Sequence, residues 1–225
     1  MQDRQQTVNE HIYFLGTGVR MIELGKKQKL LVVKTVDFGI YLGEDRNAPQ
    51  NERVLLPSKQ VPEGTKVGDE IEVFIYKDSQ DRLIATTREP MLQVGQTAVL
   101  KVKQVTRIGA FLDWGLEKDL LLPYHEQTNR VREGEECLVA LYVDKSSRLC
   151  ATMKVYHYLS TRTPYVPGDM VKGRVYEISD RFGVFVAVDD KYSALIPARE
   201  AKGKYRPGKI LELRVSEVKE DGKMN

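Results

Sequence analysis

The sequence predicts an all-β protein of three small barrels in tandem, because one skeleton of glycines and a proline recurs three times along the chain. The spacing is kept: the proline lies 11 residues before the last glycine in every copy, and the first two glycines are 14, 14 and 15 residues apart. A repeat of roughly 70 residues is too long for a solenoid unit and suits a small domain with its own core. The positions are Gly25, Gly39, Pro57 and Gly68, then Gly95, Gly109, Pro123 and Gly134, then Gly168, Gly183, Pro197 and Gly208.

Each copy opens on a strand in which apolar and basic residues alternate, as in Val99–Lys103 and Val171–Val175. Alternation sends one face of a strand inward and leaves the basic face outside. The second strand contains a glycine, which marks a bend or a close backbone approach where a small barrel coils over itself. These second strands are expected at Asp37–Leu42, Arg107–Leu112 and Arg181–Val186.

A third short strand ends at the proline of each copy, where the missing N–H stops the ladder, and one helical turn follows. The fourth strand begins after the last glycine, and a polar hairpin leads to the fifth. Five strands with a short turn between the third and the fourth predict a Greek-key barrel of the OB-fold type. We expect third strands at Leu55–Pro57, Leu121–Pro123 and Leu195–Pro197, fourth strands at Ile71–Tyr76, Cys137–Val143 and Ile210–Val215, and fifth strands at Leu83–Thr86 and Leu149–Thr152.

The copies set the expected domain boundaries: barrels at residues 21–89, 90–160 and 161–225, preceded by residues 1–20 as a tag-like or poorly ordered extension. The third copy lacks most of its fifth strand, so we expect an incomplete third barrel in a truncated chain. The connectors, Thr87–Pro90 and Tyr156–Pro167, are short and contain proline, which restricts how far neighbouring barrels swing.

Composition places the 225-residue chain among ordinary soluble globular proteins, with 41% apolar and 30% charged residues. No stretch is long and apolar enough for a bilayer, and the first 20 residues lack the order of a secretory signal, so we expect a cytoplasmic protein without membrane contact. Cys137 and Cys150 are expected to be buried free thiols, with a disulfide or a metal pair as the alternative. The three histidines form no metal-binding spacing, and no cofactor is expected.

The net charge of +3 is a mild basic bias that fits a nucleic-acid binder. Basic residues recur on or beside the opening strand of every copy. Two interpretations of this recurrence stay open at this point: a solvated strand face, or a groove that follows phosphates. The residues are Lys26, Lys27, Lys29 and Lys34, then Lys101, Lys103 and Arg107, then Lys172, Arg174 and Arg181.

The second strand of the third copy, Arg181–Val186, following Val171–Val175, resembles the signature of the S1-type RNA-binding domain, an OB-fold barrel. The resemblance covers all three copies, about nine tenths of the chain, with strand order, glycines and aromatic residues in agreement. Three such domains in tandem are similar to the bacterial conserved virulence factor B family. That family adds a C-terminal winged-helix domain, which we expect to be missing from this sequence.

The resemblance implies an RNA face made of the two aromatics around the second-strand glycine, a His at the end of the third strand, and an Asp and an Arg at the last hairpin. The aromatic positions hold Phe182 and Phe185, Phe38 and Tyr41, and in the second copy Phe111 alone, since Ile108 replaces the other ring. The His position holds Pro57, Pro123 and Pro197, a departure in every copy. The hairpin positions hold Asp78 and Arg82, Asp144 and Arg148, and Lys219 and Lys223.

Exposed rings beside a glycine bend suit a single-stranded nucleic acid, because each base stacked on a ring gains about 1–3 kcal/mol irrespective of sequence. Basic residues on the adjoining strand, such as Lys172, Arg174 and Arg181, would then hold phosphates, as would Lys101 and Lys103 in the second copy. The competing interpretation places Phe38, Phe111 and Phe182 in the barrel cores. The third copy has two rings and the most basic hairpin, so it is expected to dominate binding.

We therefore expect a bacterial RNA-binding protein, without catalysis of its own, that binds single-stranded RNA. DNA is a second candidate ligand, and a monomer is expected. A role in post-transcriptional control of gene expression is what the family resemblance implies. Two alternatives remain: a protein-interaction module built on OB barrels, or the binding portion of a larger nuclease or translation factor. An acid–base pair of His125 and Glu126 finds no nucleophile or third group to support it.

Overall fold

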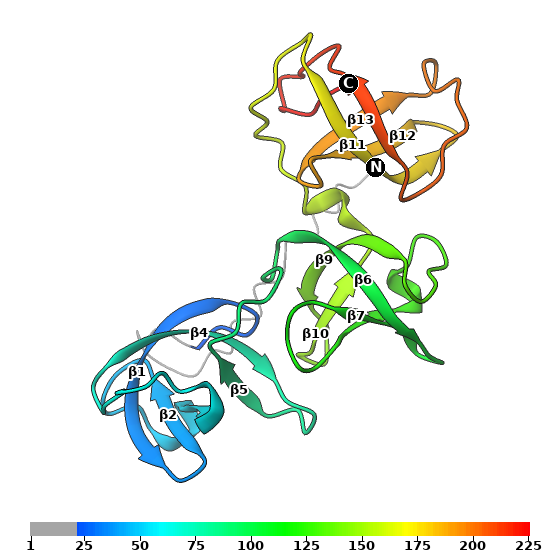
Figure 1. The fold of residues 1–225 in the computed structure, drawn as a ribbon. Coiled ribbons are helices and arrows are strands. Elements are labelled where there is room, and N and C mark those ends of the chain that lie inside the picture. Colours follow the sequence, from blue (N-terminus) through cyan, green and yellow to red (C-terminus); the bar gives the residue numbers. More distant parts are fainter. Residues whose placement is uncertain (1–21) are drawn as a thin grey trace. The chain divides into compact units, whose positions relative to one another are not determined.

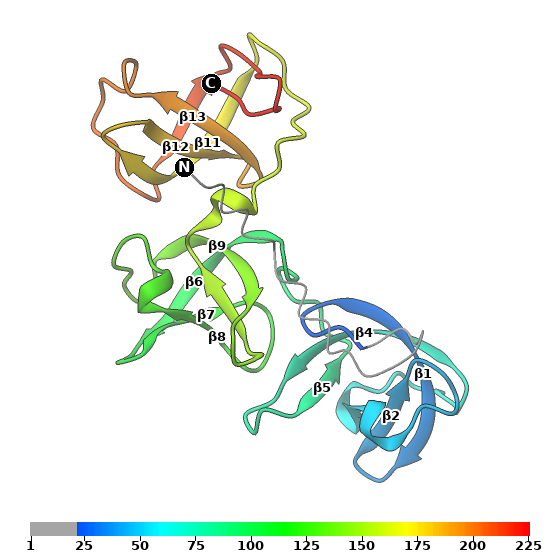
Figure 2. The same cartoon turned by 180° about the vertical axis from the view of Figure 1, so that it is seen from behind.

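A computed structural model describes residues 22–225, and the expected extension at residues 1–20 lies outside this range (Figure 1). The described chain is all-β, as predicted, with short 3-10 turns as its only helical elements. It divides into two compact units, the first built on the first barrel and the second on most of the second barrel together with the third. Figure 2 shows the same strands from behind.

The first barrel is closed by five strands in the order β1-β2-β3-β5-β4. The barrel closes between β3 and β5, which run parallel and pair only through Leu55 and Ile84. A 3-10 turn, η2 (Ser58–Gln60), follows the third strand, as expected from the sequence. The strands are β1 (Lys27–Val36), β2 (Gly39–Gly43), β3 (Val54–Pro57), β4 (Glu70–Lys77) and β5 (Leu83–Thr86), with a further 3-10 turn, η1 (Gln50–Glu52).

The second barrel repeats this plan, with the order β10-β8-β7-β6-β9 and a single parallel pair, Leu121 with Cys150. The turn after its third strand is η3 (Tyr124–Glu126), and the connector to the third barrel contains η4 (Val155–His157). The strands are β6 (Thr97–Val105), β7 (Gly109–Asp113), β8 (Leu120–Pro123), β9 (Glu136–Val143) and β10 (Leu149–Thr152).

The third copy forms a four-stranded sheet, β13-β12-β11-β14, so the expectation that it lacks a regular fifth strand is confirmed. One residue stands in for that strand: Met224, only 1% exposed, makes a parallel bridge with Ala194 of β13. This bridge matches the single parallel pair that closes each of the other barrels. The strands are β11 (Met170–Ser179), β12 (Gly183–Val188), β13 (Tyr192–Pro197) and β14 (Ile210–Arg214).

The glycine at the start of each second strand sits against the backbone of the third strand. A Cβ at Gly39, Gly109 or Gly183 would lie 2.2, 2.3 or 2.1 Å from the carbonyl oxygen of the residue before the strand-ending proline. Their φ angles of +153°, +151° and +119° also disfavour any side chain. The predicted close backbone approach is thus present in all three barrels.

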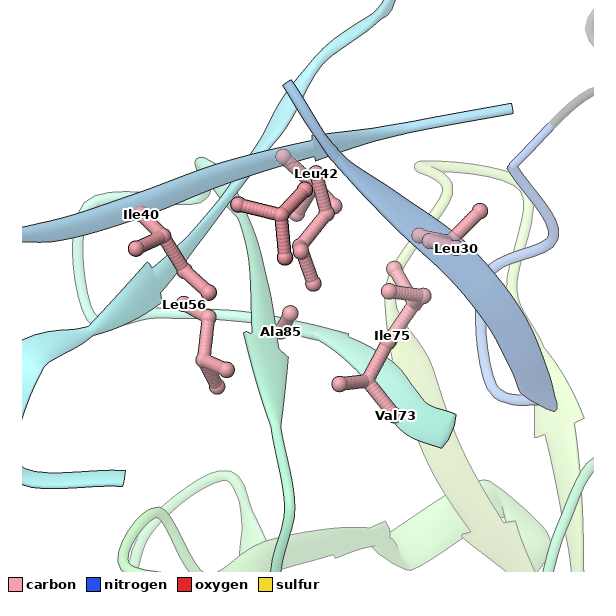
Figure 3. Close-up of a cluster of buried hydrophobic side chains, with 9 residues drawn as sticks. Leu30, Ile40, Leu42, Leu56, Val73, Ile75 and Ala85 are labelled. Carbon is pink, nitrogen blue, oxygen red and sulfur yellow. The ribbon is translucent and has the colours of Figure 1, made fainter. Parts of the chain in front are cut away.

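Inward-facing aliphatic residues fill each barrel, as the alternation predicts. In the first, Leu30, Leu42 and Leu56 come from three different strands and are at most 1% exposed (Figure 3). The second barrel adds Trp114, the chain's one tryptophan, whose indole N–H donates to the carbonyl of Lys118 at 2.6 Å. Trp114 is 2% exposed, so its fluorescence reports on the packing of this barrel alone.

A polar contact ties the turn after the third strand to the fifth strand in both closed barrels. The Thr86 hydroxyl donates to the side-chain oxygen of Gln60, and the Thr152 hydroxyl donates to the Glu126 carboxylate at 2.6 Å. Because Glu126 is engaged here and with Lys154, the His125–Glu126 pair has a structural explanation. The contact stabilises each barrel next to the single parallel residue pair that closes it.

Both cysteines are buried free thiols, as expected. Burial raises the pKa of Cys137 to about 12, and its thiol faces the carbonyl of Leu100 at 3.8 Å. Below about pH 7.5 the thiol is protonated in folded and unfolded chains alike, because the pKa of an unfolded cysteine is about 8.5. As the pH rises from about 7.5 toward 12, only the unfolded thiol ionises, so the free energy of unfolding of the second barrel falls.

Urea unfolding is followed by Trp114 fluorescence at about pH 7 and at about pH 10.5. We expect the urea midpoint to decrease between these two pH values, and the decrease to be larger in the wild type than in a Cys137→Ala variant. Other groups titrate in both proteins, and the comparison removes their contribution. An equal alkaline loss in the two proteins would contradict this role of Cys137.

Within residues 22–225, no helix has the length and apolar character that a membrane span requires. The same residues contain no group of three or more His, Cys, Asp or Glu side chains placed to hold a metal ion.

Candidate nucleic-acid interface

In the third barrel, the two predicted aromatics lie together at the glycine bend. The ring centroids of Phe182 and Phe185 are 6.4 Å apart, with the rings inclined at 67°. Phe182 is 53% exposed, so it is not a core residue. The Arg181 guanidinium carbon lies 5.1 Å from the centroid of the Phe182 ring, which places a cation directly at this surface.

Phe185 differs from Phe182 because it is half-buried. Its ring lies 5.8 Å from Tyr156 and 6.0 Å from Tyr176, and it packs against a buried cluster shared by the second and third barrels. Burial raises the pKa of the Tyr176 hydroxyl, which therefore stays neutral. Phe185 thus packs on the buried cluster with one side and forms part of the aromatic surface with the other. The buried members of the cluster are Leu138, Ala140, Val155, Leu159, Tyr176 and Ala187.

The basic residues predicted for the third barrel have different surroundings. Arg174 is engaged in an ion pair, with its Nε donating to the Asp190 carboxylate at 2.7 Å and its side chain only 13% exposed. Lys172 is exposed, but it lies about 13 Å along β11 from Glu177, the partner of Phe185, once the register shift between Val175 and Glu177 is taken into account. The Asp190 carboxylate thus largely neutralises Arg174, and Lys172 lies farther along the strand, so Arg181 and the lysines of the C-terminal hairpin are the remaining basic groups of the predicted set.

That hairpin brings Lys223 to the interface. Its ammonium lies 5.6 Å from the centroid of the Tyr156 ring and 2.8 Å from the Asp221 carboxylate. The Asp221 carboxylate and, to a smaller extent, the Tyr156 hydroxyl raise the pKa of Lys223, which keeps its charge at neutral pH. Lys219 is exposed, and its backbone N–H donates to the carbonyl of Lys223 at 2.9 Å.

The first barrel repeats the aromatic pair. Phe38 is 57% exposed, and its ring centroid lies 6.4 Å from that of Tyr41. The register places Tyr41 between Lys34 and Leu55, so an apolar row with a lysine at its end crosses the sheet. Phe38 is therefore on the surface beside Tyr41, and the role of this pair in RNA binding stays a prediction.

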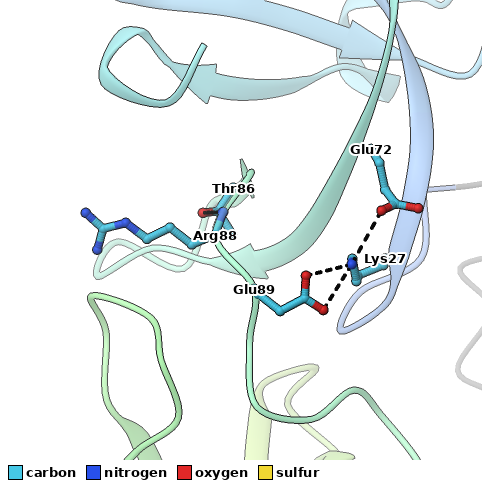
Figure 4. Close-up of polar contacts among 5 residues, drawn as sticks. All are labelled: Lys27, Glu72, Thr86, Arg88 and Glu89. Atoms are coloured by element: carbon cyan, nitrogen blue, oxygen red, sulfur yellow. Dashed lines mark hydrogen bonds and ion pairs between the residues drawn. The ribbon is translucent and has the colours of Figure 1, made fainter. Parts of the chain in front are cut away.

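Other charged residues of the first barrel are paired with one another. Arg82 donates twice to the Asp78 carboxylate, at 2.9 and 2.7 Å. Burial alone would raise the pKa of Asp78, but hydrogen bonds from Arg82 and Gln80 hold it below its usual value. Lys27 is bound by Glu89, at 2.8 Å, and by Glu72, and Glu89 contributes most to raising the pKa of Lys27 (Figure 4). The basic cluster of the first copy is therefore partly neutralised.

In the second barrel, Phe111 is half-buried and Ile108 is 61% exposed, so the second ring is absent from β7. Tyr124 of η3 supplies a ring nearby: its hydroxyl donates to the carbonyl of Thr106 at 2.6 Å, next to the glycine bend. Arg130 lies over this ring, with its guanidinium carbon 5.2 Å from the centroid. Tyr124 does not stand out in the repeat pattern of the sequence, although its place directly after Pro123 is a signal that could have indicated it.

The predicted basic residues of the second barrel contribute unequally. Lys103 is bound to the Asp119 carboxylate at 2.8 Å, which raises the pKa of Lys103. Lys101 is exposed and lies between Asp113 and Glu136 in the register of the sheet. At the hairpin, the Asp144 carboxylate accepts the backbone N–H of Arg148 at 2.9 Å.

Comparison with known proteins identifies the domain type of all three copies. A family model described as S1 domain matches residues 24–88 and 94–154, and one described as S1 RNA binding domain matches residues 166–225. Together these matches cover most of the chain.

Full-length relatives and a solved structure agree with these matches. The chain is 32% identical over 213 residues to uncharacterized protein YitL of Bacillus subtilis, covering 89% of this chain and 68% of that protein. It is 25% identical over 188 residues to conserved virulence factor B of Staphylococcus aureus, covering 79% and 62%. A crystal structure of a multidomain protein with nucleic acid binding domains from Streptococcus pneumoniae has the same fold, with a TM-score of 0.54, 21% identity and coverage of 90% and 72%. The chain thus spans about two thirds of the length of the two sequence relatives.

Proposed function

Because this chain belongs to the S1 domain family, we propose that it binds single-stranded RNA on the aromatic faces of its barrels, with the third barrel dominant. The observation that carries the proposal is the exposed ring Phe182 with a guanidinium at its face. A flat apolar ring beside a cation suits an unpaired base and its phosphate. Phe38 beside Tyr41 supports a second face of the same kind.

Single-stranded RNA fits these faces better than a duplex does. The bases of a single strand are splayed and can stack on protein rings, whereas in an A-form duplex they are paired and stacked on one another. Tandem faces then raise the apparent affinity, because once one barrel is bound the others meet the same strand at high effective concentration.

The experiment that tests this function is a gel-shift titration with single- and double-stranded RNA and DNA across a range of salt concentrations. We expect single-stranded RNA to bind most tightly. The plot of log affinity against log salt should have a slope of about −2 or steeper, which corresponds to about three phosphate contacts at −0.7 each. A preference for duplexes, or no shift with any nucleic acid, would contradict the proposal.

The alternative of a protein-interaction module is favoured by one observation, the exposed Ile108 where the second barrel lacks a ring. Capture of a protein partner that is insensitive to salt, together with no RNA shift, would support that alternative. The binding portion of a larger nuclease or translation factor would instead bind RNA as proposed here, with the chemistry supplied by another domain.

The proposed cellular role is post-transcriptional control of gene expression in the cytoplasm, by a protein that binds RNA without catalysis. The support is the similarity to conserved virulence factor B and the presence of three tandem S1 domains. We also propose residues 21–89, 90–160 and 161–225 as the three domains, since each range holds one set of strands.

A further inference from the structure

A third aromatic ring lies at the interface of the third barrel and comes from outside its strands. Tyr156 belongs to η4, in the connector between the second and third barrels. Its ring centroid is 5.8 Å from that of Phe185, and the two rings are nearly perpendicular, at 88°. Phe185 therefore contacts one ring from its own bend, Phe182, and one from the connector.

The two outer rings share the same chemistry. Phe182 is 53% exposed with Arg181 at 5.1 Å, and Tyr156 is 36% exposed with the ammonium of Lys223 at 5.6 Å. Each thus combines an accessible ring with a cation, the pair of groups that contacts a base and its phosphate. Lys223 also pairs with Asp221, but this pair is solvent-exposed and therefore weak.

The turn that carries Tyr156 is fixed in place. Val155 and Leu159, on either side of it in sequence, are 0% and 6% exposed and belong to the buried cluster that joins the second and third barrels. The Tyr158 N–H donates to the carbonyl of Val155 at 2.8 Å, which closes the turn. A ring already held in position loses little conformational freedom when a base stacks on it.

We propose that Tyr156 is a base-stacking residue of the third barrel's RNA site and that Lys223 holds an adjacent phosphate. The inference rests on the proposed function, and it extends the site from the barrel into the connector. The site then depends on the packing of the second barrel against the third, because that packing holds the turn.

The test compares Tyr156→Leu, which keeps apolar bulk without a ring, with Tyr156→Phe, which keeps the ring, in binding of a short single-stranded oligouridylate to the full chain. We expect Tyr156→Leu to bind about fivefold to a hundredfold more weakly, the range for one lost stacked base. Tyr156→Phe should stay within about twofold of the wild type, because the hydroxyl is not needed for stacking.

A second measurement uses the wild-type protein, so its result does not depend on whether a substitution destabilises the fold. RNA carrying 5-iodouridine, irradiated in the complex and analysed by mass spectrometry, should cross-link to Tyr156 as well as to Phe182. Cross-links at Phe182 without any at Tyr156, or unchanged binding by Tyr156→Leu, would overturn this inference and leave the proposed function standing. Loss of the proposed function itself would appear differently, as unchanged binding by Phe182→Ala.

Discussion

Replacing Gly109 by Ala lowers the free energy of unfolding of the second barrel by at least about 3 kcal/mol, the sum of a strained backbone and an overpacked contact. The added Cβ would lie 2.3 Å from the carbonyl oxygen of Leu122 and 2.9 Å from the Cα of Pro123. Both are backbone atoms within a paired strand, so neither moves without breaking the ladder between β7 and β8. The φ of +151° adds strain of its own.

Gly134→Ala is the matched control in the same barrel. Its φ of +83° is also positive, but an added Cβ meets nothing within 4 Å, so we expect a loss of about 1–2 kcal/mol from strain alone. Urea unfolding followed by Trp114 fluorescence measures both variants, because this buried indole is the chain's one tryptophan. Equal losses in the two variants would show that the close approach at Gly109 does not matter.

Replacing Phe182 by Ala weakens binding of single-stranded RNA about fivefold to a hundredfold and leaves the barrel folded. The ring is 53% exposed, so its removal opens no cavity, and the lost energy is that of a stacked base and of the Arg181 contact. Gel-shift titration at low salt measures the affinity, and thermal unfolding measured alongside confirms the fold.

Met170→Ala is the control for this variant. Met170 is 67% exposed in the same barrel, and with the register shift in β11 it lies about 20 Å from the position that pairs with Phe185. We expect its RNA affinity to equal that of the wild type. Equal effects of the two substitutions would mean that general surface apolarity, rather than the ring, supports binding. Phe185→Ala is less suitable because Phe185 also packs in the buried cluster.

The sequence predicts the fold because the residue types that the barrel requires are set by local backbone geometry. A glycine is required where two backbones meet, a proline ends a strand, and alternation fills the core, so Gly39, Gly109 and Gly183 mark equivalent bends in three copies. The sequence left open whether Phe182 and Phe38, beside two of these bends, lie in the cores or on the surface, and the structure shows that both are exposed.

The sequence pattern does not predict features that depend on tertiary contacts. Arg174 counts as a basic groove residue in the sequence, but Asp190, from the turn between β12 and β13, binds it in the structure. Phe185 is half-buried because a neighbouring barrel covers it, and Tyr156 reaches the interface because buried neighbours hold its turn there. No periodicity within a single copy encodes contacts between copies.

The single parallel pair that closes the first and second barrels, and the single bridge that takes its place in the third copy, also have a consequence for folding during synthesis. The closing residues Ile84, Cys150 and Met224 come last in their copies, so each barrel can seal before the next copy has been translated. The nascent chain therefore exposes the unpaired strand edges of two different copies at the same time only briefly. For three repeats with the same strand pattern, this order of emergence protects against strands of one copy pairing with those of another.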